Sequence, residues 1–250
     1  MQKRKSMAGK KKKMGTMKKI YILHGWTYCS KDSNPLDKWN PFIKLLLSKN
    51  IQPILWRIPG LTKNMNEIWN LDKYVDWLKK TLSKEKDQII LIGHSNGGRI
   101  ALSFAEKYPE KVAKLILIDS AGIYHNELPI RLKRFVFKMM AKIGKKFTSS
   151  ENLKNILYKL AREGDYKNAS PSQRQTMLSL INTDLSEVLS KIKVPTLIIW
   201  GKDDQVTPLS DGKLIQKLIK NSQFFVINGA RHSPQFTHPK EVIKIIHECL

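Results

Sequence analysis

The sequence contains a serine whose neighbours are typical of an enzymatic nucleophile. Ser95 is the middle residue of the segment Gly93–Gly97 (GHSNG), which directly follows an apolar run at residues 89–92 and precedes a helical pattern. Small residues on both sides let a strand and a helix meet at a sharp turn, where the middle residue is strained and its side chain is exposed. This context predicts that Ser95 is a nucleophile. The alternative is a glycine-rich connection that contains a serine by chance.

Candidates for the base and the acid that such a serine requires follow two later strand-like runs. A serine hydroxyl reacts when a base takes its proton, and a catalytic histidine needs a carboxylate to orient it. His232 comes shortly after the run at residues 223–227. Asp203 and Asp204 follow the run at residues 196–200. Serine, acid and histidine occur in this order on the sheets of many hydrolases, so we expect His232 to be the base and one of these aspartates the acid.

The first strand-like run offers a site for a developing negative charge. Residues 19–23 are apolar and end in His24-Gly25-Trp26. A loop after such a strand can present a backbone N–H to an oxyanion, and Gly25 lets that backbone come close. We therefore expect the N–H groups of Trp26 and Asn96 to form an oxyanion hole.

Strand-like and helical patterns alternate along most of the chain. The expected strands are residues 19–23, 51–58, 89–92, 114–119, 196–200 and 223–227, and the expected helices include residues 36–48, 71–82, 214–219 and 240–249. Alternation of this kind predicts an α/β fold with a mostly parallel sheet of about six strands and helices on both faces.

The alternation stops in the second half of the chain. Residues 122–190 contain helical patterns at 130–143, 153–160 and 173–181 and no strand-like run. An all-helical insertion between strands of such a sheet commonly forms a lid over the carboxyl ends of the strands. We expect a core at residues 18–121 and 191–250 and a helical lid at residues 122–190, whose methionines and phenylalanines favour an apolar acyl group.

Composition narrows the class of protein. The chain has 250 residues with 41% hydrophobic content, which suits one domain, and it lacks the run of about 20 apolar residues that a membrane span requires. Its two cysteines, Cys29 and Cys249, form no disulfide framework or metal-ligand spacing. These features predict a cytoplasmic protein without a metal or other cofactor.

Positive charge is high throughout the sequence. The formal net charge is +24, and residues 1–17 form a basic segment that we expect to be a disordered tail. Such charge attracts anionic partners without specificity. Because no nucleic-acid-binding motif accompanies it, we expect no specific nucleic-acid partner.

Together these segments resemble the α/β-hydrolase fold family, in its single-domain form with a lid. The resemblance covers residues 18–250. It rests on segments 23–26, 59–60, 93–98, 200–204, 229–232 and 238–239. The family pattern places its acid three residues after the glycine at position 201, which implies Asp204. A minority of relatives carry the acid one strand earlier, so Asp119 is the reserve candidate. The chain departs from the family at residues 57–62, where the usual acidic and histidine positions are absent, and it lacks the first two family strands.

The resemblance implies a serine hydrolase that forms an acyl-enzyme on Ser95. A small molecule with a carboxylic ester, thioester or related acyl bond is the expected substrate. Acyltransferases, perhydrolases and lyases use the same three residues, so these activities remain alternatives. A hydrolase-like binding protein without activity is a further alternative, although such proteins usually lack one of the three residues.

Basic residues in the predicted lid raise the question of a protein partner. Arg131, Arg134 and Lys138 share one face of an expected helix. Some esterases of this family act on acyl groups that are tethered to acyl carrier protein. Docking of that anionic carrier on this face is therefore an alternative to a free substrate. The expected outcome is a solvated face in a chain that is rich in lysine everywhere.

Overall fold

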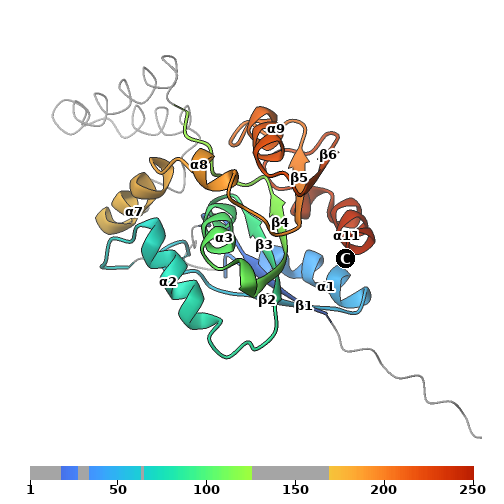
Figure 1. Cartoon of the computed structure of the whole chain (residues 1–250), viewed down its shortest axis with the longest axis horizontal. Coiled ribbons are helices and arrows are strands. Elements are labelled where there is room, and N and C mark those ends of the chain that lie inside the picture. Colours follow the sequence, from blue (N-terminus) through green and yellow to red (C-terminus); the bar gives the residue numbers. More distant parts are fainter. Residues whose placement is uncertain (1–17, 28–33, 63–64, 126–168) are drawn as a thin grey trace, which may run out of the picture.

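The described residues of the chain form one six-stranded parallel sheet. The computed structural model describes residues 18–27, 34–62, 65–125 and 169–250 (Figure 1). The strand order is β2-β1-β3-β4-β5-β6, and every neighbouring pair is parallel. The strands are β1 (Lys18–Leu23), β2 (Ile51–Leu55), β3 (Ile89–His94), β4 (Val112–Ile118), β5 (Thr196–Gly201) and β6 (Ser222–Ile227). The predicted six strands and their parallel arrangement are confirmed.

Helices cover both faces of this sheet. They are α1 (Asn40–Ser48), α2 (Leu71–Thr81), α3 (Asn96–Lys107), α7 (Pro171–Ile181), α8 (Ser186–Leu189), α9 (Leu209–Leu218), α10 (Pro234–Thr237) and α11 (Pro239–Glu248). Two short 3₁₀ helices, η1 (Asp37–Trp39) and η2 (Pro109–Lys111), precede α1 and β4. Helices α1 and α11 lie side by side on one face (Figure 1), and α2, α3 and α9 pack on the other.

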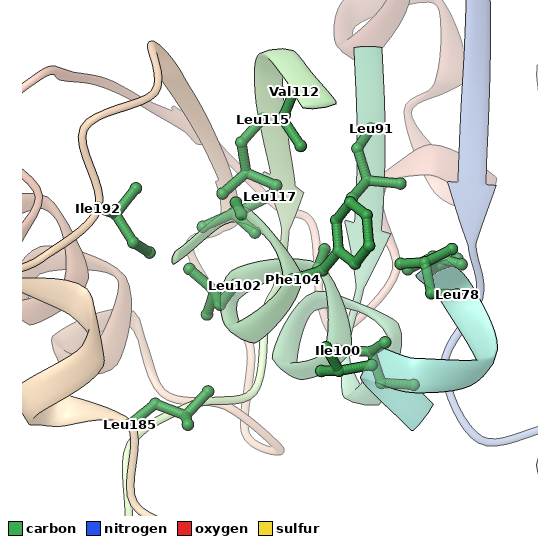
Figure 2. Close-up of a cluster of buried hydrophobic side chains, with 14 of the residues drawn as sticks. Leu78, Leu91, Ile100, Leu102, Phe104, Val112, Leu115, Leu117, Leu185 and Ile192 are labelled. Carbon is green, nitrogen blue, oxygen red and sulfur yellow. The ribbon is translucent and has the colours of Figure 1, made fainter. Parts of the chain in front are cut away.

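Alternation along the strands explains the two layers of core. Tyr21 and Leu23 of β1 belong to the cluster under α2 and α3, whereas Ile20 and Ile22 belong to the cluster under α1 and α11. Successive side chains of a strand point to opposite faces, so a strand buried on both faces is apolar throughout. Apolar residues of α3, β3 and β4 lie together in the first cluster (Figure 2).

The carboxyl ends of the strands meet at one edge of the sheet. The chain passes from β1 to β2 on one side and then returns to place β3 on the other side of β1. The loops after β1 and β3 therefore diverge, and ligands of open α/β sheets bind at such a reversal. The segments that carry Trp26 and Ser95 both start here.

The predicted second strand is shorter in the structure. Strand β2 ends at Leu55 and not at Ile58, and the chain then crosses the end of the sheet, where Ile58 N donates to His24 Nε2 at 3.1 Å. β2 is an edge strand that pairs only with β1, so residues beyond Leu55 are free to leave the sheet. This loop helps to fix the histidine before Trp26.

Helices α7 and α8 are the described part of the predicted insertion. Helix α7 confirms the helical pattern at 173–181 and is fixed to the loop before α2, because Gln173 Nε2 donates to Gly60 O at 3.0 Å and Trp69 N donates to Thr176 Oγ1 at 2.9 Å. Around α8, Leu185 and Leu189 join the hydrophobic cluster that contains α3. The patterns at 130–143 and 153–160, the tail at residues 1–17 and the basic face at Arg131 lie outside the described residues.

Candidate active site

Ser95 occupies a strained turn between β3 and α3. Its backbone angles are φ 53° and ψ −122°, in a region that residues with a Cβ rarely adopt. The turn is possible because Gly97 lies against β1: a Cβ there would be 2.1 Å from Leu23 O. The Ser95 carbonyl oxygen accepts hydrogen bonds from Gly98 N at 2.9 Å and Ala121 N at 3.0 Å, which fix the turn. The side chain of Ser95 is thus held at the end of the sheet by backbone packing.

Ser95, His232 and Asp204 form a continuous chain of hydrogen bonds. The Nδ1–H of His232 donates to Asp204 Oδ2 at 2.7 Å, since a carboxylate can only accept. This leaves His232 Nε2 to accept the hydroxyl proton of Ser95 at 3.0 Å. The side chain of Asp204 is fully buried and that of His232 is 21% exposed. The acid is therefore shielded from solvent, whereas the base is partly accessible to it. In this arrangement the histidine can take the proton of the serine and remain oriented by the acid.

The Asp204 carboxylate is surrounded by donors. Its Oδ1 accepts from Val206 N at 2.7 Å and from Thr207 N at 3.2 Å, and its Oδ2 accepts from Thr207 Oγ1 at 2.7 Å as well as from His232. These bonds replace the hydration that a buried charge loses. The adjacent Asp203 is exposed, and the structure therefore separates the two aspartates that the sequence places side by side.

Asp119 lies beside Asp204 in a different environment. It is fully buried at the end of β4, with Oδ1 accepting from Gly201 N at 2.7 Å and with Oδ2 lacking a partner among the described residues. Burial, followed by the charge of Asp204, raises the pKa of Asp119 to about 8. At neutral pH this carboxyl is protonated. The hydrogen bond from His232 goes to Asp204.

The loop after β1 lies directly against Ser95. A Cβ on Gly25 would be 2.8 Å from Ser95 Cβ, so the next residue, Trp26, is a neighbour of the nucleophile. Asn96 begins α3, where N–H groups have no partner within the helix. Within the described ranges, the backbone N–H groups of Trp26 and Asn96 donate to no other residue. Both remain available to an oxyanion.

Two buried histidines fix the backbone around these groups. His24 donates from Nδ1 to Gly25 O at 2.7 Å and accepts from Ile58 N at Nε2, which uses both ring nitrogens. Burial lowers the pKa of His24 to about 4. His94 Nε2 donates to His232 O at 3.3 Å, and burial also lowers the pKa of His94 well below its usual value. Both rings are therefore neutral at pH 7, and they hold Gly25 and the backbone of His232.

Thr207 is the residue of this site that the sequence reasoning missed. Its hydroxyl lies 2.7 Å from Asp204 Oδ2 and 3.2 Å from His232 Nδ1. An aspartate in a loop commonly accepts from backbone N–H groups a few residues later, which brings the side chain of such a residue close to the carboxylate. That signal was present in the sequence.

Three groups at this site also have the composition of a metal site. Ligand atoms of Asp119, Asp204 and His232 lie within 4.8 Å of one another. Both oxygens of Asp204 and both nitrogens of His232 already take part in hydrogen bonds. The arrangement fits a histidine that takes the proton of Ser95 while Asp204 orients it better than it fits coordination of a cation.

Comparison with known proteins agrees with this geometry. The protein-family model described as alpha/beta hydrolase fold matches residues 20–239 of the sequence. The chain belongs to the α/β-hydrolase fold family. The predicted family and fold, and with them the prediction of an enzyme, are confirmed.

Relatives within the family include proteins named as a lipase and as esterases. The chain is 29% identical to monoacylglycerol lipase ABHD6 of Mus musculus over 92% of its own length and 75% of that protein. It is also 29% identical to pimeloyl-[acyl-carrier protein] methyl ester esterase of Wigglesworthia glossinidia brevipalpis, over 91% of each chain. A thermophilic esterase from Thermogutta terrifontis has the same fold, with a TM-score of 0.68 at 21% identity over 94% of this chain and 90% of that one.

Within the part of the chain that the structure describes, no helix is both long enough and apolar enough to cross a bilayer.

Proposed function

We propose that this chain is a serine hydrolase that cleaves a carboxylic ester, thioester or related acyl bond through an acyl-enzyme on Ser95. The observation that carries the proposal is the hydrogen-bonded chain from Asp204 through His232 to the hydroxyl of Ser95. The strained turn at Ser95 supports it, because strain of this kind is concentrated at functional residues.

Each residue then has a defined role in the reaction. Ser95 Oγ attacks the carbonyl carbon while His232 Nε2 takes its proton, and Asp204 stabilises the imidazolium that forms. The N–H groups of Trp26 and Asn96 bind the negatively charged oxygen of the tetrahedral intermediate. The intermediate collapses, and the leaving alcohol or thiol receives the proton from His232. Water then attacks the acyl-enzyme by the same route and releases the acid.

A small carboxylic ester is the proposed substrate class. Two relatives support it, one named for monoacylglycerol and the other for a methyl ester. Because the second relative is named for a carrier-linked substrate, one acyl ester should be tested both free and attached to acyl carrier protein, at low and high salt. Equal turnover of both forms supports a free substrate. A preference for the carrier that salt abolishes supports docking through exposed charges.

Replacement of the serine tests the proposal. We expect Ser95→Ala to lower turnover of p-nitrophenyl acetate, butyrate and octanoate by at least about 10⁴-fold without loss of folded protein. Ser210→Ala is the matched control, because Ser210 is exposed on α9. Full turnover in Ser95→Ala would refute the proposal.

We also propose a cytoplasmic location. Two cysteines in 250 residues allow at most one disulfide, which suits a reducing compartment. Fractionation of cells that express the full chain tests this, and recovery with the membrane fraction would contradict it.

A further inference from the structure

Building on the proposed hydrolase, we infer that Asp119 is a positioning residue: its carboxyl oxygen holds Gly201, the first residue of the loop at residues 201–207, and so fixes Asp204 against His232. This role differs from that of a reserve acid, which would itself bind His232.

The carboxyl group of Asp119 holds the start of the loop. Asp119 follows β4, and Gly201 is the last residue of the neighbouring strand β5. The 2.7 Å bond from Gly201 N to Asp119 Oδ1 is buried, so water cannot replace it. Gly201 also packs against the loop of the base, since a Cβ there would lie 2.4 Å from Arg231 O. A shift of Gly201 would therefore move Asp204 relative to His232.

The backbone of Asp119 contacts the end of the same loop. Thr207 Oγ1 lies 3.3 Å from Asp119 O. The same hydroxyl lies 2.7 Å from Asp204 Oδ2 and 3.2 Å from His232 Nδ1, and its single proton goes to the nearer carboxylate. Thr207 thus donates to Asp204 and packs beside Asp119 O and His232 Nδ1 at the end of the loop.

The conformation of Asp119 is unfavourable, which argues for a role. Its φ of 42° is rare for a residue with a side chain, and its Oδ2 is buried without a partner among the described residues. Strain and unsatisfied polar atoms persist mainly where function requires them. The carboxyl groups of Asp119 and Asp204 are close, so two negative charges there would repel each other. A raised pKa favours the protonated form of Asp119, whose Oδ1 still accepts from Gly201 N.

Two variants of Asp119 separate positioning from catalysis. Asp119→Asn keeps an oxygen that accepts from Gly201 N and is neutral like the protonated acid, so we expect its kcat to stay within a few-fold of that of the wild type. Asp119→Ala removes the acceptor, and we expect kcat to fall by about 10²-fold with KM unchanged, as for a displaced catalytic group. The proton NMR signal of His232 Nδ1–H should be retained in Asp119→Asn and shifted or lost in Asp119→Ala.

The outcomes are distinct from those that test the proposed function. A loss of about 10⁴-fold in Asp119→Asn would make Asp119 the acid itself and overturn the inference. Wild-type kcat and NMR signal in Asp119→Ala would also overturn it. If Asp119→Ala does not fold, Asp119→Leu replaces it, because leucine has a similar shape and no acceptor: kcat should fall, and full activity in Asp119→Leu would refute the link. An inactive wild type, or an active Ser95→Ala, would refute the hydrolase proposal instead.

Discussion

The turn at Ser95 and the loop at Asp204 are held in place by different kinds of interaction. Backbone hydrogen bonds and the close approach of Gly97 to β1 fix the turn. Side-chain hydrogen bonds fix the loop, where the N–H and hydroxyl groups of Thr207 donate to Asp204 and the carboxyl group of Asp119 accepts from Gly201 N. A change in the turn should therefore affect stability, whereas a change in the loop should affect catalysis in a folded protein.

The largest effect is expected from the acid. Asp204→Asn keeps the volume of the side chain but favours the wrong tautomer of His232, so ester turnover should fall by about 10⁴-fold. Circular dichroism should show an intact fold. Asp203→Asn is the matched control, because Asp203 is exposed, and it should retain wild-type activity. Equal losses in the two variants would contradict the assignment of the acid.

The next effect concerns the turn. In Gly97→Ala the added Cβ would lie 2.1 Å from Leu23 O, and the backbone of β1 or α3 has to move. We expect the free energy of unfolding to fall by about 3 kcal/mol, the upper part of the range for an overpacked core. Thermal unfolding should begin about 10 °C lower. Wild-type stability in this variant would show that the turn is looser than its geometry indicates.

Acid should destabilise the loop around Trp26 through His24. The pKa of His24 is 6.5 in the unfolded chain and about 4 in the fold, so between these values the unfolded chain binds a proton that the folded chain does not. The contribution of His24 to the free energy of unfolding is fully present above pH 6.5. It falls by up to about 3 kcal/mol as the pH drops to about 4. His94 acts in the same direction. Asp119 acts in the opposite direction, because the fold retains its proton to about pH 8.

A comparison of two chains isolates this contribution. Urea unfolding of the wild type and of His24→Gln should be measured from pH 7 to pH 4.5. The free energy of unfolding of the wild type, minus that of the variant, should fall over this interval, because the other titrating groups act equally in both chains. Parallel curves would show that His24 does not titrate with a lowered pKa.

The smallest effect is expected at a glycine in the loop of the base. Gly229 has φ of 72°, but nothing lies within 4 Å of the position that a Cβ would take. Gly229→Ala should therefore lower the free energy of unfolding by about 1 to 2 kcal/mol, through the backbone strain of the left-handed region alone. Ester turnover should be retained. A loss as large as that of Gly97→Ala would mean that backbone strain at Gly229 costs as much as the steric overlap at Gly97.

The same contrast explains how much the sequence predicted. The turn at Ser95 depends on residues within a few positions of one another, and its glycines identify it directly. The carboxyl ends of β5 and β6 were predicted from their apolar runs. In a parallel sheet these ends lie at the same edge, so Asp204 and His232 were predicted to lie close together. The bond between Asp119 and Gly201 N depends on the adjacency of β4 and β5, which no local pattern encodes.

Element ends were predicted less well for a related reason. Helix α9 begins at Leu209, directly after Pro208, although its apolar spacing is clear only from Leu214. A helix start is set by its first turn, and proline is favoured near that position. Strand β2 ends early because an edge strand has one partner.

Covalent labelling of Ser95 tests the central claim most directly. The folded chain would be treated with a fluorophosphonate, and its peptides would be analysed by mass spectrometry. We expect one adduct, on Ser95, that forms far more slowly in His232→Ala and is absent in Ser95→Ala, because a serine activated by His232 reacts readily with such a probe. An unlabelled Ser95 in the folded wild type, or equal labelling rates in the wild type and His232→Ala, would contradict it.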